Sequence, residues 1–317
     1  MNGRLVSFAE NVFYETVDGR IGRVWSVIDR AASYILANGP ATGQDRWEEN
    51  SGYTPYSLAV EIAALLAAAD WAAAMGREDF ARDLRETADV WNRSVEEWTY
   101  ARDTELCREV GVDGYYVRIA PAEGEGPPVT RPVLVKNHLG QDASQPAWAI
   151  VSPDALALVR FGLRAADDPR ILNTINVIDH LLKVEFPLGP CWKRYNGDGY
   201  GEHADGSGYD GSGIGRAWPL LTGERGHYEL AAGRADRAAS LLGTMEKLTS
   251  PGGLLPEQVW DAADIPEHEL YGGKPSGSAM PLVWAHSEHI KLRRSLADGR
   301  VFDLPPQTVA RYLSEKA

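Results

Sequence analysis

The sequence predicts an all-α fold in which helical hairpins form a ring. Apolar residues recur at helical spacing in eight segments, separated by connections rich in glycine and proline. In a series of antiparallel helical hairpins, alternate connections lie at opposite ends of the helices. Connections as long as the longer ones here are usually functional. We therefore expect all the long connections to share one face. The short connections are 76–78, 165–168 and 233–234, and the long ones are 38–53, 99–151, 184–212 and 249–275.

The first three helices follow from local signals. Apolar spacing predicts a helix over about residues 20–37. Thr54 and Pro55 offer an N-cap and a first-turn proline for the second helix, which we expect to end at Gly76. The third helix begins almost at once and carries an apolar stripe as far as Trp98.

The second part of the chain follows the same logic. The connection 99–151 is expected to be irregular, apart from a short strand at 115–119. Pro219 predicts that the sixth helix is kinked or starts late. The helices expected after this connection span about 152–164, 168–182, 214–232, 235–248 and 277–295, with a short one near 306–315.

Composition and charge narrow the classes of function. The net charge of -13 argues against nucleic acid or an anionic membrane surface as a partner. The chain has two cysteines, Cys107 and Cys191, which could form one disulfide but are too few for a metal-binding cluster. We therefore expect neither metal nor cofactor. We find no signal-peptide run and no apolar stretch of bilayer length, and we therefore expect a cytoplasmic protein without a membrane partner.

The stretch 43–50 is the strongest candidate for chemistry. It places the adjacent carboxylates Glu48 and Glu49 beside Trp47, with Asp45 and Arg46 just before. An indole against an acid pair suits sugar chemistry, and we interpret Glu48 as a general acid for glycosidic-bond cleavage. A solvated acidic surface patch remains the alternative for such a pair. The ten tryptophans likewise fit sugar-stacking platforms or the packing of a helical core.

A second carboxylate is needed, and Glu257 supplies the candidate. It lies on another long connection, and hydrolysis needs one acid to protonate the leaving oxygen and one carboxylate to activate water. Taken alone, Glu257 is better explained as a helix-terminal or loop acid with no role. A third long connection carries Arg194, whose guanidinium fork suits sugar hydroxyls. A calcium loop starting at Asn196 is rejected, because its twelfth position is Ser207 rather than a glutamate.

Together these segments resemble glycoside hydrolase family 15, the glucoamylase and glucodextranase group, particularly its bacterial members. The matches are ordered along about residues 20–315. They comprise 38–50, 194–203, 213–226, 255–261 and 281–286.

The resemblance implies one catalytic domain over residues 1–317 with an (α/α)6 toroid. Such an enzyme removes glucose from non-reducing chain ends with inversion. By matching positions, Glu48 corresponds to the general acid and Glu257 to the general base. The residues expected to bind substrate are Asp45, Arg46, Trp47, Glu49, Arg194, Trp218 and Trp284.

The sequence departs from the family pattern at its start. A complete toroid has twelve helices, whereas eight and a terminal turn are predicted here, as though the first two hairpins were absent. The arginine–aspartate pair that the family places there is absent too. Apolar flanks would then be exposed. We expect an amino-terminal segment or an oligomer partner to cover them.

The expected reaction is single displacement at an anomeric carbon. Inversion predicts carboxyl groups about 6.5–9.5 Å apart, against about 5–5.5 Å for retention. We expect burial against Trp47 and the charge of Glu49 to keep Glu48 protonated. The expected substrates are α-1,4- or α-1,6-glucans such as starch, dextrin, dextran or isomalto-oligosaccharides. The alternatives are a trehalase-type member, or a carbohydrate-binding or inactive fragment.

Overall fold

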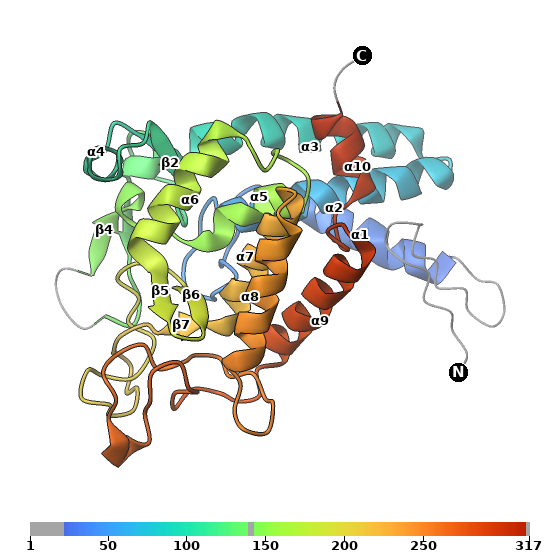
Figure 1. The fold of residues 1–317 in the computed structure, drawn as a ribbon. Coiled ribbons are helices and arrows are strands. Elements are labelled where there is room, and N and C mark those ends of the chain that lie inside the picture. Colours follow the sequence, from blue (N-terminus) through green and yellow to red (C-terminus); the bar gives the residue numbers. More distant parts are fainter. Residues whose placement is uncertain (1–21, 139–142, 315–317) are drawn as a thin grey trace.

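The computed structural model describes residues 22–138 and 143–314, and its helices follow the expected series (Figure 1). Eight helical segments match the eight that the sequence predicts. Their bounds are Gly22–Asn38 (α1), Pro55–Ala74 (α2), Glu78–Thr99 (α3), Ala157–Arg160 (α5), Pro169–Leu182 (α6), Pro219–Ala231 (α7), Ala235–Lys247 (α8) and Val283–Asp298 (α9).

Short connections join these helices into hairpins, as expected. The α2–α3 turn at Gly76 and the α7–α8 turn at Gly233 adopt φ of 71° and 74°, a left-handed conformation that glycine adopts without steric cost. Helices α2, α3 and α5 share one core cluster with Leu58, Ile62 and Leu84. A second cluster lies beneath the long connections and includes Trp47 and Trp218.

Two helices are shorter than predicted. The fourth comprises only a 3₁₀ turn, Pro153–Leu156, followed by α5, because Gly162 leaves the helix with φ of 72° where the chain passes close to Thr308. The eighth starts at Val283 instead of 277, since the preceding segment is extended and pairs with another loop. Leu282 N donates to Leu255 O at 2.9 Å in that pairing.

Helix α7 starts late, as Pro219 predicts. The residues before it, Ala217–Trp218 (β7), join a small antiparallel sheet with Lys183–Phe186 (β5) and Gly189–Lys193 (β6), in the order β5-β6-β7. The sheet draws the start of α7 against the connection that carries Arg194. The chain closes with Pro306–Thr308 (α10) and a π-helical turn, Val309–Leu313.

The connection 99–151 is more ordered than predicted. The expected strand is present but shorter, as Gly114–Tyr116 (β2) paired with Tyr100–Arg102 (β1). The unpredicted helix Glu105–Val110 (α4) is capped by Thr104, which accepts from Cys107 N at 3.0 Å. The remaining elements are Pro128–Thr130 and Ala147–Ala149, both 3₁₀ turns, and the paired strands Pro132–Leu134 (β3) and Ser144–Pro146 (β4).

Helix α2 corrects one expectation. Its 20 residues are long and apolar enough to match a membrane span in length and composition. Half of the apolar window is buried inside the protein, and residues such as Leu58, Ile62 and Leu65 are fully buried. Packing against α1, α3 and α5 accounts for this hydrophobicity.

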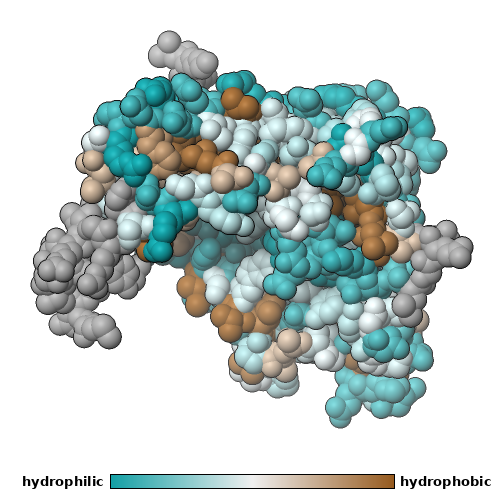
Figure 2. Space-filling model, turned by 180° about the vertical axis from the view of Figure 1, so that it is seen from behind, coloured by the Kyte–Doolittle hydropathy of each residue, from teal (hydrophilic) through white to brown (hydrophobic). Residues whose placement is uncertain are grey.

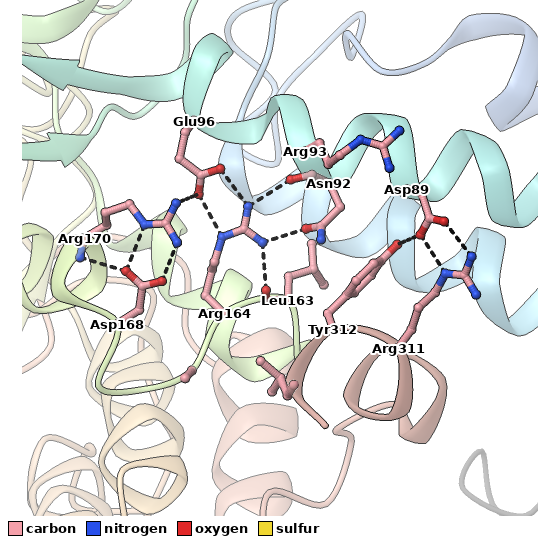
Figure 3. Close-up of a pocket in the computed structure, with 12 residues that line it drawn as sticks. Asp89, Asn92, Arg93, Glu96, Leu163, Arg164, Asp168, Arg170, Arg311 and Tyr312 are labelled. Carbon is pink, nitrogen blue, oxygen red and sulfur yellow. Dashed lines mark hydrogen bonds and ion pairs between the residues drawn. The ribbon is translucent and has the colours of Figure 1, made fainter. Parts of the chain in front are cut away.

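A cavity of about 880 Å³ lies between α3, the turn before α6 and the C-terminal helix (Figure 3). Most of its lining charges pair with one another. Arg164 binds both carboxylate oxygens of Glu96 at 2.8 Å, and Arg311 binds both oxygens of Asp89 at 2.6 and 2.5 Å. None of the residues that line it is a predicted site residue. We interpret the cluster as a clamp that holds the C-terminal helix on α3.

Candidate active site

The stretch 43–50 forms a tight turn organised by Asp45. Asp45 N donates to Asn50 O at 2.7 Å, Asp45 O accepts from Glu48 N at 2.9 Å, and its Oδ1 accepts from Glu49 N at 3.0 Å. Glu48 takes a left-handed φ of 62°, which is uncommon for a non-glycine residue and is concentrated at functional sites. The reversal buries Trp47 and Glu49 and leaves Glu48 exposed between them.

Glu49 is the centre of a buried hydrogen-bond network. Its Oε2 accepts from Arg118 Nη2 at 2.8 Å and from the Tyr195 hydroxyl at 2.6 Å. Its Oε1 accepts from Arg194 Nη2 and Asn137 Nδ2, each at 3.0 Å. Two guanidinium groups and two neutral donors therefore compensate one buried carboxylate, as a charge inside a protein requires.

Arg118 joins this network to the turn and was not predicted from the sequence. It is fully buried, donates to Asp45 Oδ2 at 2.6 Å and to Asn50 Oδ1 at 3.1 Å, and lies over the Tyr195 ring at 3.9 Å. A lone arginine in an apolar run carries no motif, so no sequence signal marked it. The backbone after Arg118 passes close to the end of the turn, and this approach requires Gly52, where an added Cβ would lie 2.5 Å from Ala120 O.

Arg194 brings the third long connection into the same site. Asp198, four residues on, fixes its guanidinium through two bonds of 2.7 Å. The guanidinium lies 5.2 Å from the Trp47 ring and 5.5 Å from the Trp218 ring. The sequence singled out Arg194 but not Asp198, although the spacing of four residues was a usable signal.

The three predicted tryptophans gather around these charges. The Trp47 ring lies 5.3 Å from that of Trp218 and 5.5 Å from that of Trp284. Trp47 and Trp218 are 7% and 4% exposed, whereas Trp284 is half-buried. Of the three, Trp284 therefore offers the most accessible ring, and the other two also serve as core.

Arg46 occupies the floor beside the tryptophans. It binds both oxygens of Glu224 at 2.6 and 3.0 Å, and its Nη2 lies 2.7 Å from Asp154 Oδ1. Its guanidinium stacks on Trp47 at 4.5 Å and on Tyr56 at 4.4 Å. Burial raises the pKa of Asp154 to about 6, although Arg46 opposes the shift. Neither Asp154 nor Glu224 was predicted, since neither belongs to a local motif around Arg46.

Glu257 is half-buried on the fourth long connection. Its backbone N donates to Ala279 O at 2.8 Å, in the extended segment before α9. Its Oε1 is buried and has no hydrogen-bond partner among the described residues, while the Tyr200 hydroxyl and the Gln258 side chain lie close enough to the carboxylate to favour its ionised form. Burial raises the pKa of Glu257, while Tyr200, Gln258 and the charge of Arg194 partly oppose the rise.

The long connections therefore converge on one site, as expected. Tyr200 connects the surroundings of Glu257 with those of Glu49, since its ring lies 6.4 Å from that of Trp218 and 4.9 Å from the Arg194 guanidinium. The predicted burial of Glu48 against Trp47 is wrong, because the left-handed turn directs Glu48 outward into an exposed position. The predicted carboxyl separation of about 6.5–9.5 Å stays a prediction.

The described part of the chain offers little for metal or thiol chemistry. No group of three or more histidine, cysteine, aspartate or glutamate side chains there could hold a metal ion. Cys107 and Cys191 are both free and buried, which answers the open question of a disulfide. A cavity of about 340 Å³ borders the site at Tyr195 and Asp198.

A match to one protein family covers most of the chain. The family model for glycosyl hydrolases family 15 matches residues 13–294. The chain belongs to glycosyl hydrolase family 15. A glucoamylase from Clostridium sp. (strain G0005) is 40% identical to it over 291 residues, which are 92% of this chain and 38% of that protein.

Solved structures of glucoamylases support the same fold. A bacterial glucoamylase complexed with acarbose matches with a TM-score of 0.82 and 39% identity, over 92% of this chain and 41% of its own. A glucoamylase from Saccharomycopsis fibuligera matches at 15% identity with a TM-score of 0.57, over 95% of this chain and 66% of its own, and shows the fold alone. The expected (α/α)6 toroid fold is confirmed. The chain spans about two-fifths of the length of the relatives near 40% identity.

Proposed function

We propose that this chain carries the site of an exo-acting, inverting α-glucosidase that releases glucose from non-reducing ends of α-1,4- or α-1,6-glucans. The observation that carries the proposal is Glu257, a half-buried carboxylate with a donor-free, buried oxygen next to the Arg194–Glu49 network. A general base needs such an oxygen to accept a proton from water. The glucoamylase matches and the acarbose complex of one relative support a saccharide substrate.

The proposed reaction assigns opposite tasks to two carboxyl groups. Protonated Glu48 donates its proton to the glycosidic oxygen as the bond from that oxygen to the anomeric carbon breaks. Ionised Glu257 takes a proton from water, whose oxygen bonds to the same carbon from the other face. Glu48 ends ionised and Glu257 protonated, so proton exchange with solvent resets the pair.

The buried groups around the carboxylates are proposed to hold the sugar in place. Trp284 offers an accessible aromatic face, and Arg194 offers donors already oriented by Asp198. Glu49 and Trp47 shape the same wall. Asp45 and Arg46 are engaged by the protein itself, through Arg118 and Glu224, so their proposed contribution is to fix the site.

Replacing Glu257 by Gln tests the proposal directly. E257Q is expected to lose glucose release by at least about 10²-fold, because the base can no longer accept a proton, and to keep binding of acarbose. Glucose release is measured on maltose, isomaltose, dextran, starch and trehalose, and NMR follows the anomer formed first. Turnover by E257Q at the wild-type rate, or retention of configuration, would contradict the assignment.

The second candidate function is carbohydrate binding without turnover. It is supported by exposed apolar side chains on α1 and on α9, whose positions in the fold Figure 1 shows and which an amino-terminal segment or an oligomer partner would cover. Wild-type binding of acarbose with no glucose release from any of the five substrates would favour it. Release of glucose from trehalose alone would favour the trehalase-type member.

A further inference from the structure

We propose that Tyr200 is a positioning residue, whose hydroxyl orients the Glu257 carboxylate toward the attacking water and ties it to the network that holds the acid turn. The inference rests on the proposed function, in which Glu257 is the base. Nothing in the sequence patterns singled out Tyr200, which lies six residues after Arg194 in a glycine-rich stretch.

The backbone of Tyr200 is fixed from both sides of the site. Its N–H donates to Asp198 Oδ1 at 2.9 Å, the same carboxylate that grips Arg194. Its carbonyl accepts from Gln258 Nε2 at 3.0 Å, the residue that follows Glu257. Gln258 in turn accepts from Arg216 N at 2.9 Å. Two long connections are therefore joined at Tyr200, one bearing Arg194 and the other bearing Glu257.

The Tyr200 ring is held as firmly as its backbone. It lies 5.1 Å from the Tyr209 ring, 6.4 Å from the Trp218 ring and 4.9 Å from the Arg194 guanidinium. A ring packed on three sides offers its hydroxyl in one place. Burial raises the pKa of Tyr200 to about 12, so the hydroxyl stays protonated and acts as a donor at neutral pH.

The hydroxyl acts on a carboxylate whose Oε1 has no hydrogen-bond donor in the described part of the chain. Glu257 accepts from Tyr200, and its Oε1 is buried and free of partners within the described residues. The Gln258 side chain also favours the ionised form of Glu257, so Tyr200 and Gln258 together hold the carboxylate while Oε1 keeps no partner in residues 22–138 and 143–314. The other charged groups that act on Glu257 are Arg194, which favours its ionised form, and Glu202, which opposes it.

Removing the hydroxyl with Tyr200→Phe keeps the ring and tests the role. The donor stabilises ionised Glu257, so its loss should raise the pKa of that carboxyl and move the acid limb of the kcat/KM profile to higher pH by about half a unit or more. We expect kcat to fall about tenfold and KM to stay within about twofold. The titration of Glu257 is also read directly by NMR of ¹³C-labelled glutamate, with its signal identified by its loss in E257Q.

Tyr312→Phe is the matched control. It removes a tyrosine hydroxyl that binds Asp89 at 3.0 Å, outside the site, and should leave both the pH profile and kcat unchanged. An unchanged Glu257 titration in Y200F, or a rise in KM with kcat preserved, would overturn the positioning role. If the wild type releases no glucose while the NMR titration still shifts in Y200F, the proposed function fails and the hydrogen bond to Glu257 stands.

Discussion

Glu48 and Glu49 are neighbours in the chain with opposite surroundings. The left-handed turn at Glu48 leaves that side chain exposed, while Glu49 is buried among four donors. A general acid must reach a substrate oxygen, so an exposed side chain suits the role proposed for Glu48. A buried, fully bonded carboxylate such as Glu49 suits the holding of fixed geometry.

Glutamine at each position should therefore give different defects. E48Q should lower kcat about 10²–10⁴-fold with little change in thermal stability, because it removes the proton donor alone. E49Q should lower the free energy of unfolding by about 3 kcal/mol, because Arg118 and Arg194 lose the charge that compensates them. Thermal unfolding and glucose release measured on both variants check the contrast. Equal losses of stability would refute it.

At the scale of elements, ion pairs link helices that share no long connection. Arg160 on α5 donates to Glu288 on α9 at 2.8 Å and to both oxygens of Asp303, while His227 on α7 lies 2.6 Å from Glu288. Burial alone would raise the pKa of Asp303, but Arg160 outweighs it and lowers the pKa to about 2. The pKa of Glu288 is lowered for the same reason.

These lowered pKa values predict acid sensitivity. A carboxyl whose pKa is lower in the folded than in the unfolded state stabilises the fold above the unfolded value, near 4, and that stability is lost as pH falls toward 2. Asp303→Asn should therefore cost about 2 kcal/mol at pH 7 and less than half of that near pH 2.5. Thermal unfolding of wild type and variant across this range checks it. A difference that stays constant with pH would contradict the ion-pair account.

At the scale of the whole molecule, apolar side chains are exposed along two of the helices. Val27 and Tyr34 on α1 are 57% and 68% exposed, and Val283 and Ile290 on α9 are 73% and 66% exposed. Each pair is seven residues apart, so each forms a stripe on one helix face. Seen from behind, the largely hydrophilic surface is also interrupted by apolar areas (Figure 2). Stripes of this kind promote association.

Charged substitutions on α9 should suppress that association. We expect the chain to self-associate at concentrations near 100 μM, and V283K with I290K together to shift it toward monomer. Sedimentation velocity measures the change. Leu172→Lys on α6, where the side chain is 41% exposed, is the control and should leave association as it was. A wild type that is monomeric at every concentration would contradict the prediction.

The sequence predicts long-range architecture better than the details of the site. Helical periodicity and loop lengths anticipate α1, α2, α3 and the hairpin at Gly233, since these depend on local patterns. The motifs anticipate which loops meet. Arg118 and Tyr200 escape prediction, because their roles arise only when separate connections fold against each other. The left-handed turn that exposes Glu48 escapes too, since hydrogen bonds to Asp45 decide it.

Helices α2 and α7 both run away from the site, so the site and the turns that end these helices lie at opposite ends of the ring. Both helices point their first residues at the site, and their last residues lead into the turns at Gly76 and Gly233. At 1.5 Å per residue, the 20 residues of α2 carry its far turn about 30 Å from Pro55. A surface tether or fusion partner attached at either turn would therefore present Glu48 and Glu257 to the solution. Polymeric substrates, which cannot turn to reach a buried face, would benefit most from that orientation.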